Sequence, residues 1–210
     1  LIGHRILDDP RNKLVLHFVR IVAELDAKTF VFENVKGLTV GRHKQFLAEL
    51  VEAFDKAGYQ VRLPWRVLDA AHFGVPQHRE RLILIGAKKG LPLPEYPKAT
   101  TTPADGRRAV QGLPQGPSCA DAIGDLPDAD RFAGLEEGDA VRTSSFKKPS
   151  PYAAELRGLT NDAWHFGYVR NWNPDQLTSS ARTAHTDISR RRFRETKPGT
   201  VEPISRFYRL

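Results

Sequence analysis

The sequence has one cysteine, Cys119, and no methionine among its 210 residues. A single thiol cannot build a disulfide framework within the chain, which favours a reducing compartment. No C-x-x-C pair or histidine cluster has the spacing of metal ligands, so the sequence predicts no metal site. No apolar run is long enough to span a membrane, so we expect no membrane contact.

The chain also lacks an initiating methionine and a signal-peptide pattern, because it begins at Leu1. A start in the middle of a pattern, with no methionine anywhere, leads us to expect a fragment. A segment preceding Leu1 would then carry part of the function.

The charge is biased towards the basic side. Lysine and arginine number 32 against 25 aspartates and glutamates, a net charge of +7. Residues 182–210 hold eight basic and three acidic residues, a balance of +5. This distribution favours a polyanionic partner and places the basic excess near the C-terminal end.

Helical and strand patterns alternate in the first part of the chain. Asp9 and Pro10 predict a helix start, and apolar residues recur at helical spacing as far as Leu25. Phe30 to Phe32 form a continuous apolar run, typical of a strand in a sheet covered on both faces.

The pattern then repeats. Residues 43–57 predict a second helix, residues 59–68 predict extended structure, and residues 81–86 predict another buried strand. Helices alternating with short buried strands indicate an open, doubly wound α/β sheet, in which ligands bind beyond the carboxyl ends of the strands. Prolines and glycines crowd residues 88–117, so a domain boundary is expected there, and we place it between residues 115 and 116.

Polar residues follow the first predicted strand in "FVFENVKGL", where Glu33 and Asn34 come directly after Phe32. A carboxylate at the carboxyl end of a buried strand would face the ligand crevice of such a sheet. The alternative is that Glu33 caps the following turn or pairs with a lysine.

A second polar group precedes the strand in "VPQHRERLILIG". On an extended chain Gln77, Arg79 and Arg81 would form one row, because residues two apart point to the same side. Two guanidiniums and an amide suit an anionic or heteroaromatic ligand. The alternative is an ordinary charged strand start, with an arginine paired to Glu80 or Glu95.

Together these two segments resemble the DNA cytosine-5 methyltransferase family, in which a Glu-Asn-Val strand end is followed by a Gln-x-Arg-x-Arg motif. Both occur here, at residues 33–35 and 77–81, and the similarity extends to "DDPRNKL" at 8–14 and "DAIGDLP" at 121–127. The resemblance implies that residues 1–115 form the second half of a Rossmann-like sheet dependent on S-adenosylmethionine. Residues 116–210 would then be part of a smaller target recognition domain.

The resemblance also implies a mechanism. In this family a cysteine thiolate attacks C6 of a cytosine flipped out of the duplex, and C5 takes the methyl group of S-adenosylmethionine. By this similarity Glu33 would protonate N3, favoured by partial burial, and Asn34 would order the pocket. Arg79 or Arg81 would contact the base carbonyl or the reactive centre, and Gln77 would line the pocket or touch the DNA backbone.

The nucleophile of the family lies in a Pro-Cys-Gln segment that this sequence lacks. Cys119 follows the arginine motif instead of preceding the Glu-Asn-Val strand, so we expect it to be incidental and not the nucleophile. Truncation just before Leu1 would explain the missing segment. It would also place most of the S-adenosylmethionine site outside this chain and leave the chain inactive alone.

The C-terminal part would contact double-stranded DNA. We expect Arg190, Arg191 and Arg192 to bind phosphates, and nearby aromatic residues suit stacking. These aromatic residues are Trp164, Phe166, Tyr168, Trp172, Phe193, Phe207 and Tyr208. The alternative for the arginines is a solvated charged face.

The leading hypothesis is therefore a bacterial enzyme of the cytoplasm, monomeric and associated with DNA, that belongs to a restriction-modification system. Two alternatives stay open: a catalytically inactive DNA-binding or regulatory relative, and a tRNA cytosine-5 methyltransferase.

Overall fold

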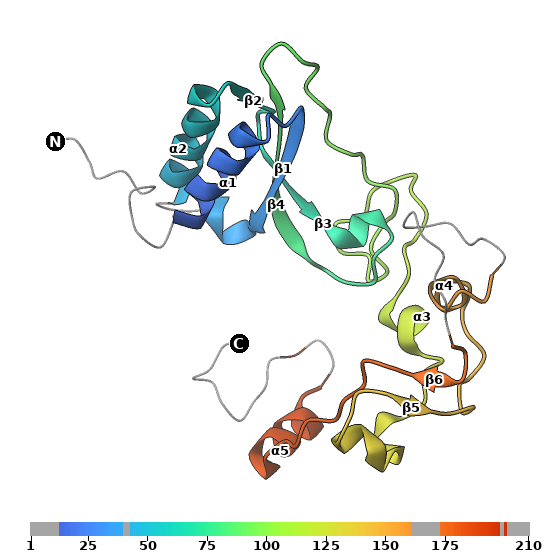
Figure 1. Ribbon diagram of the computed structural model, residues 1–210. Coiled ribbons are helices and arrows are strands. Elements are labelled where there is room, and N and C mark those ends of the chain that lie inside the picture. Colours follow the sequence, from blue (N-terminus) through green and yellow to red (C-terminus); the bar gives the residue numbers. More distant parts are fainter. Residues whose placement is uncertain (1–12, 40–42, 161–172, 198–199, 201–210) are drawn as a thin grey trace. The chain divides into compact units, whose positions relative to one another are not determined.

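The structure is a computed structural model that describes residues 13–39, 43–160, 173–197 and 200 (Figure 1). The chain divides into two compact units, Leu1–Ala122 and Ile123–Leu210. The predicted helix start at Asp9 and Pro10 lies outside the described residues. The division falls after Ala122, whereas the sequence placed a boundary between residues 115 and 116, and the functional identity of the two units stays a prediction.

The first unit is built on a four-stranded sheet. Strand β4 (Glu80–Lys88) lies at its centre, with β1 (Thr29–Val35) along one edge and β2 (Tyr59–Val61) and β3 (Arg66–Asp69) along the other. Every pairing among these strands is antiparallel.

The α/β class is therefore confirmed, but the described strands do not form the mostly parallel ladder of a doubly wound sheet. The chain passes from β3 to β4 through a short connection that includes a single 3-10 turn, Ala70–Phe73. A parallel neighbour would need a crossover of a dozen or more residues, so this connection reverses the chain direction.

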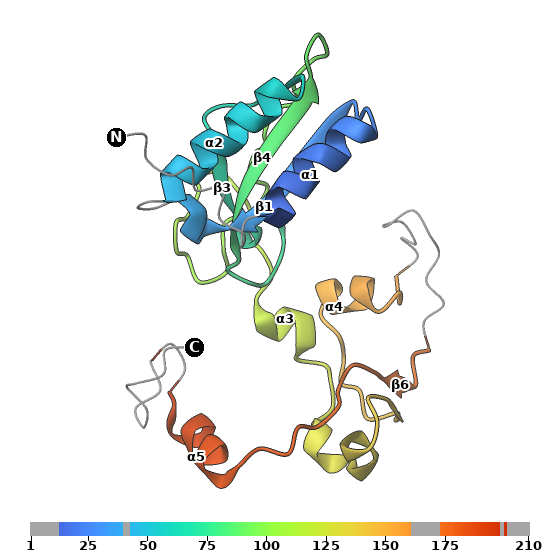
Figure 2. The ribbon, with the colours of Figure 1, turned by 60° about the vertical axis from the view of Figure 1, so that its left-hand side comes forward.

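Helices α1 (Lys13–Glu24) and α2 (His43–Lys56) cover one face of the sheet (Figures 1 and 2). Their apolar side chains recur at helical spacing and pack on alternate residues of β1 and β4. The buried cluster contains Val19 and Val22 of α1, Phe46, Leu47, Leu50 and Phe54 of α2, Phe30 and Phe32 of β1, Tyr59 of β2, and Leu82 and Leu84 of β4.

The opposite face of β1 is open, so the expectation of a strand covered on both faces is wrong. Val31 and Val35 are 60% and 53% exposed, while Phe30 and Phe32 are both 6% exposed. Successive side chains of a strand point to opposite faces, and only the even-numbered positions of β1 meet the helices. The odd-numbered positions, which include Glu33, lie on the open face.

A glycine in the centre of the sheet permits the packing of its aromatic core. A Cβ atom on Gly86 would lie 2.2 Å from the Phe30 ring. Phe30 in turn stacks on Phe54 with ring centroids 4.1 Å apart. Gly86 therefore marks a close approach, which is one of the reasons for a glycine in a strand interior.

The second unit contains short elements. Strands β5 (Val141–Arg142) and β6 (Gln176–Leu177) pair antiparallel, and helices α4 (Pro151–Leu156) and α5 (Asp187–Glu195) follow β5 and β6 respectively. Helix α3 (Cys119–Ile123) begins just before the division between the units. Within the described residues, no helix has the length and apolar character needed to cross a membrane.

Candidate active site

The open face of the sheet brings together the two charged residues singled out at the strand ends. Val35 of β1 pairs with Arg81 of β4, which places Glu33 diagonally beside Arg81 on the same face. Arg81 Nε lies 2.7 Å from Glu33 Oε1. The guanidinium also donates through Nη1 to the backbone oxygen of Glu80, at 2.9 Å. Arg81 therefore holds the carboxylate from a fixed position at the start of β4.

Glu33 therefore pairs with an arginine instead of a lysine, and Arg81 pairs with Glu33 instead of Glu80 or Glu95. Lys36, the lysine nearest to Glu33 in the chain, pairs with Glu80 at 2.9 Å. Arg62 pairs with Glu95 at 2.9 Å, so Arg81 uses the backbone oxygen of Glu80 and neither of the two glutamate carboxylates. The expected partial burial of Glu33 is wrong, because its side chain is 52% exposed.

Gln77 and Arg79 do not continue the row that begins at Arg81. Gln77 lies in a bend before β4, which starts only at Glu80, so the extended geometry assumed for all three residues is wrong for Gln77. Both side chains are exposed. In the described part of the chain no hydrogen bond or ion pair holds either side chain.

Asn34 has a local role in the structure. Its Oδ1 accepts a hydrogen bond from the backbone N–H of Val35 at 2.8 Å. It lies on the face opposite to Glu33, because adjacent residues of β1 alternate. Its direct contribution to a pocket stays a prediction.

Sequence reasoning missed Asp69, which organises the turn before β4. Asp69 Oδ1 accepts the backbone N–H of Arg79 at 2.9 Å and that of Ala71 at 3.3 Å, and Oδ2 lies 2.7 Å from His78 Nδ1. Burial would raise the pKa of this 5% exposed carboxyl, but the hydrogen bonds from His78 and the two N–H groups outweigh burial and lower the pKa. The sequence signal that could have identified Asp69 is its position directly after an extended segment, where an aspartate favours the cap of a following turn.

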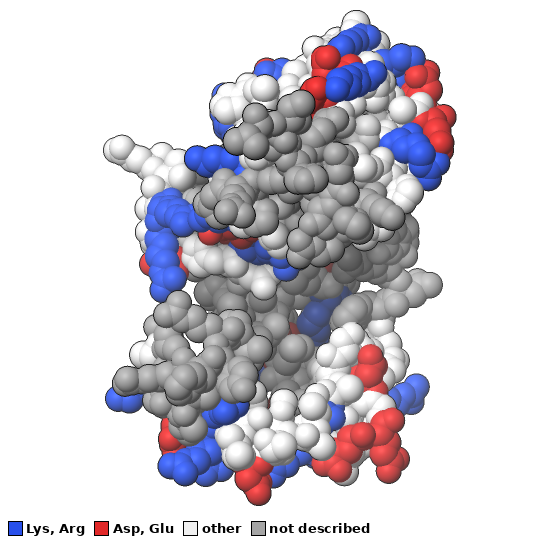
Figure 3. All heavy atoms as spheres, turned by 90° about the vertical axis from the view of Figure 1, so that its left-hand side faces the viewer, with Lys and Arg blue, Asp and Glu red and all other residues white. Residues whose placement is uncertain are grey.

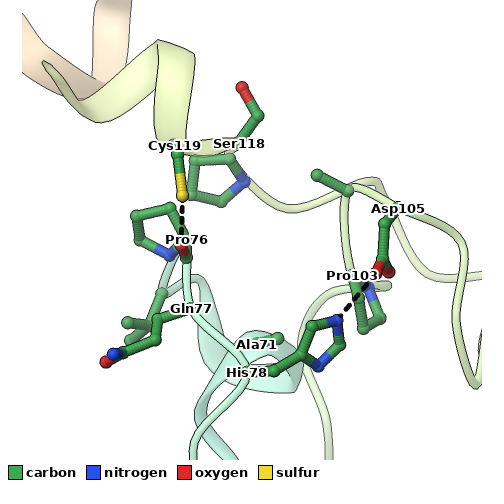
Figure 4. Close-up of a pocket in the computed structure, with 11 residues that line it drawn as sticks. Ala71, Pro76, Gln77, His78, Pro103, Asp105, Ser118 and Cys119 are labelled. Atoms are coloured by element: carbon green, nitrogen blue, oxygen red, sulfur yellow. Dashed lines mark hydrogen bonds and ion pairs between the residues drawn. The ribbon is translucent and has the colours of Figure 1, made fainter. Parts of the chain in front are cut away.

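A cavity of about 460 Å³ lies beside this turn (Figure 4). Its lining combines apolar side chains such as Pro76 and Pro103 with His78, Asp105 and Cys119. Cys119 is exposed, and its Sγ donates to the backbone oxygen of Pro76 at 3.1 Å. Cys119 therefore contributes to the packing of α3 against the turn.

The described residues contain no cluster of three or more histidine, cysteine, aspartate or glutamate side chains suited to a metal ion. A second cavity of about 550 Å³ is lined by residues of β3 and the segment 97–99. Neither described cavity includes a glycine-rich turn at a helix N-terminus, the arrangement that binds nucleotide-like cofactors.

The basic residues of the second unit lie on a separate helix. Helix α5 is capped by Thr186, whose side chain accepts from the backbone N–H of Ser189. Arg190 and Arg191 are exposed, and Arg191 Nε pairs with Glu195 Oε1 at 2.8 Å, whereas Arg192 is half-buried. On the face shown in Figure 3, basic side chains are interspersed with acidic ones. Of the predicted stacking residues only Phe193, 65% exposed, falls among those that the structure describes.

The structure is thus an α/β sheet in which Glu33 and Arg81 lie side by side at neighbouring strand ends. The C-5 cytosine-specific DNA methylase family matches residues 2–196, and the chain belongs to this family. The resemblance inferred from the two motifs is thereby confirmed.

Individual relatives agree with this assignment. The Type II methyltransferase M.XorII of Xanthomonas oryzae pv. oryzae is 55% identical over 210 residues, which cover 100% of this chain and 46% of that protein. The Type II methyltransferase M.BsuRI of Bacillus subtilis is 38% identical over 125 residues, 59% of this chain and 27% of that protein.

A similar fold occurs in the crystal structure of an E. coli protein described as a DNA modification methyltransferase encoded within a prophage. It superposes with a TM-score of 0.61 at 24% identity, over 95% of this chain and 54% of that chain. The present chain thus spans about half the length of M.XorII and of this prophage-encoded protein.

Proposed function

We propose that this chain is part of an enzyme that methylates C5 of a flipped-out cytosine in a specific sequence of double-stranded DNA. The family membership and the names of the Type II relatives support this proposal, including a place in a restriction-modification system. The observation that carries it is the 2.7 Å pair of Glu33 and Arg81 on the open face of the sheet.

In this proposal Glu33 binds the Watson–Crick edge of the extruded base. A flipped base presents this edge to hydrogen-bonding side chains. The pair with Arg81 uses Oε1, and we assign Oε2 to N3 and the exocyclic amine of cytosine. Proton donation to N3 disperses the charge that builds up as C6 is attacked, and such acid catalysis contributes about 10² to 10⁴ in rate.

The two arginines then have separate roles. Arg81 orients Glu33, since its guanidinium is already engaged by Glu33 and the backbone of Glu80. Arg79, exposed and without a described side-chain partner, contacts the base carbonyl or a phosphate. Gln77 lines the pocket or touches the DNA backbone, and Asn34 fixes the end of β1.

The remaining parts of the machinery complete the proposal. S-adenosylmethionine supplies the methyl group, and most of its site lies outside this chain, as does the nucleophilic cysteine. The segment 116–210 acts as part of the target recognition domain, with Arg190, Arg191 and Arg192 on the phosphates. The complete enzyme acts as a monomer on DNA in the bacterial cytoplasm.

The test is transfer of a labelled methyl group from S-adenosylmethionine to DNA by the intact protein that contains this chain. We expect 5-methylcytosine within one DNA sequence. Specific DNA binding with no transfer would replace the proposal with an inactive DNA-binding relative, and transfer to tRNA alone would change the substrate.

A further inference from the structure

His78 lies between two carboxylates that come from different parts of the first unit. Its Nδ1 is 2.7 Å from Oδ2 of Asp69, at the end of β3. Its Nε2 is 3.1 Å from Oδ2 of Asp105, the contact drawn in Figure 4. Asp105 belongs to residues 100–108, which we call the strap. His78 belongs to the Gln-x-Arg-x-Arg motif, at a position that the motif leaves unspecified.

The carboxylates of Asp69 and Asp105 both act as hydrogen-bond acceptors, and this determines the protonation state of the His78 ring. Oδ1 of Asp69 takes the N–H groups of Ala71 and Arg79. Oδ1 of Asp105 takes the N–H of Arg107 at 2.9 Å, and Oδ2 lies 3.1 Å from Arg107 Nε. An ionised carboxylate only accepts, so each ring nitrogen must donate, and only the imidazolium form of His78 donates from both nitrogens.

The strap is fastened to the turn before β4 on both sides of His78. The N–H groups of Thr100 and Thr101 donate to the backbone oxygen of His72, at 2.9 and 3.1 Å. At the other end of the strap Arg108 pairs with Glu80, which also binds Lys36. Between the contacts at its two ends, the strap is also bound at Asp105 by His78, the residue next to Arg79.

We propose that His78 is a positioning residue of the methyl-transfer site, whose doubly protonated ring clasps the strap onto the Gln77–Arg81 motif. With Asp69 holding the backbone N–H of Arg79, the clasp limits how far Arg79 and the start of β4 can move. This role in catalysis rests on the proposed function, whereas the clasp itself does not.

The surrounding charges make the clasp sensitive to pH. Asp69 and Asp105 contact the His78 ring directly. Arg107 pairs with Asp105 and so acts on His78 indirectly, and Cys119 lines the same cavity. The hydrogen bond to Asp69, followed by that to Asp105, raises the pKa of His78 above its ordinary 6.5. Because the folded pKa is the higher one, the stabilisation is complete below pH 6.5 and is lost as the pH rises through the folded pKa.

The test follows the titration of the His78 ring by NMR in the intact protein, together with hydrogen exchange of the Thr100 and Thr101 amides. We expect a midpoint above 6.5 in the unchanged protein and a lower midpoint in Asp105→Asn. Exchange of the two amides, corrected for intrinsic base catalysis, should rise through the same midpoint. Asp55→Asn removes the same charge from α2, where Asp55 pairs with Lys89, and should leave the His78 midpoint unchanged.

A His78 midpoint that is the same in Asp105→Asn and the unchanged protein would overturn the clasp, as would amide exchange that ignores the midpoint. The catalytic role is tested by the pH profile of methyl transfer. Its alkaline decline should shift to lower pH in Asp105→Asn by the shift seen in NMR, and an unshifted profile would show that the clasp does not position the site. Absence of transfer in both proteins would refute the proposed function, while the NMR result still decides the clasp.

Discussion

Glu33 and Arg81 come from strands β1 and β4 and meet at 2.7 Å on the one face of the sheet that the helices leave uncovered. This relationship gives a role to the carboxylate that directly follows the apolar run at residues 30–32. Phe30 and Phe32 anchor β1 in the core, and the alternation of the strand turns Glu33 the other way. The core thus fixes the position of a polar side chain at its edge.

Arg81→Lys should reduce methyl transfer by about tenfold or more, although it conserves the charge. A lysine is a point charge and cannot replace a planar fork that binds Glu33 and the Glu80 backbone at once. Single-turnover rates of the intact protein measure the effect. Arg20→Lys alters an equally close arginine–glutamate pair on α1 and should leave the rate unchanged. Equal single-turnover rates for the two variants would show that Arg81 has no role in methyl transfer.

Gly86→Ala should destabilise the first unit by about 1–3 kcal/mol through overpacking. The added methyl group would meet the Phe30 ring at 2.2 Å. Denaturant unfolding measures the loss, and Phe30→Leu in the same chain should make the alanine less costly. A double variant whose destabilisation equals the sum of the two single changes would show that the two residues do not compete for space.

Local patterns predicted the elements that hold this site. The helix expected over residues 43–57 is α2, His43–Lys56, and the strand expected over residues 81–86 lies within β4, Glu80–Lys88. Apolar spacing determines such elements because each must bury one face.

Pairing and connections were harder to predict. The continuous run at Phe30 to Phe32 looked buried on both faces, but three residues are too few to distinguish such a strand from one with a single covered face. Antiparallel pairing with β4 depends on partners distant in sequence. The contacts of His78 with Asp69 and Asp105 join segments that have no periodic pattern, so local sequence patterns could not predict these contacts.

In the second unit, Asp125→Ala should cost about 3–5 kcal/mol of stability, because it leaves a buried charge without its partner. Asp125 Oδ2 and Arg157 Nη1 lie 2.6 Å apart, with side chains 1% and 10% exposed. Arg157 also lies over the Phe146 ring, at 4.0 Å from its centroid. The measurement is chemical unfolding of the intact protein, followed by a probe in this unit.

Asp130→Ala is the matched control for that change. Asp130 also pairs with an arginine, Arg182, but its side chain is 82% exposed. Exposed pairs contribute about 0–1 kcal/mol, so the control should unfold almost like the unchanged protein. Similar losses for the two variants would contradict the role of the buried pair.

Replacing both Arg190 and Arg191 by glutamine should weaken DNA binding and reduce its salt dependence. Each lost phosphate contact lowers the slope of log affinity against log salt by about one. Titrations at several salt concentrations give this slope. The same charge loss at Arg20 and Lys56, on α1 and α2, should leave it unchanged. An unaltered slope in the α5 variant would support a solvated face instead of a DNA contact.

The most direct test of the central claim compares Glu33→Gln with Glu24→Gln in methyl transfer by the intact protein. Both carboxylates pair with an arginine and are similarly exposed, at 52% and 59%, so loss of a surface ion pair is common to the two variants. Glu33→Gln should lower the single-turnover rate by about 10² or more, because an amide cannot donate the proton of a carboxyl group. Glu24→Gln should retain the full rate, and full activity in Glu33→Gln would contradict the account.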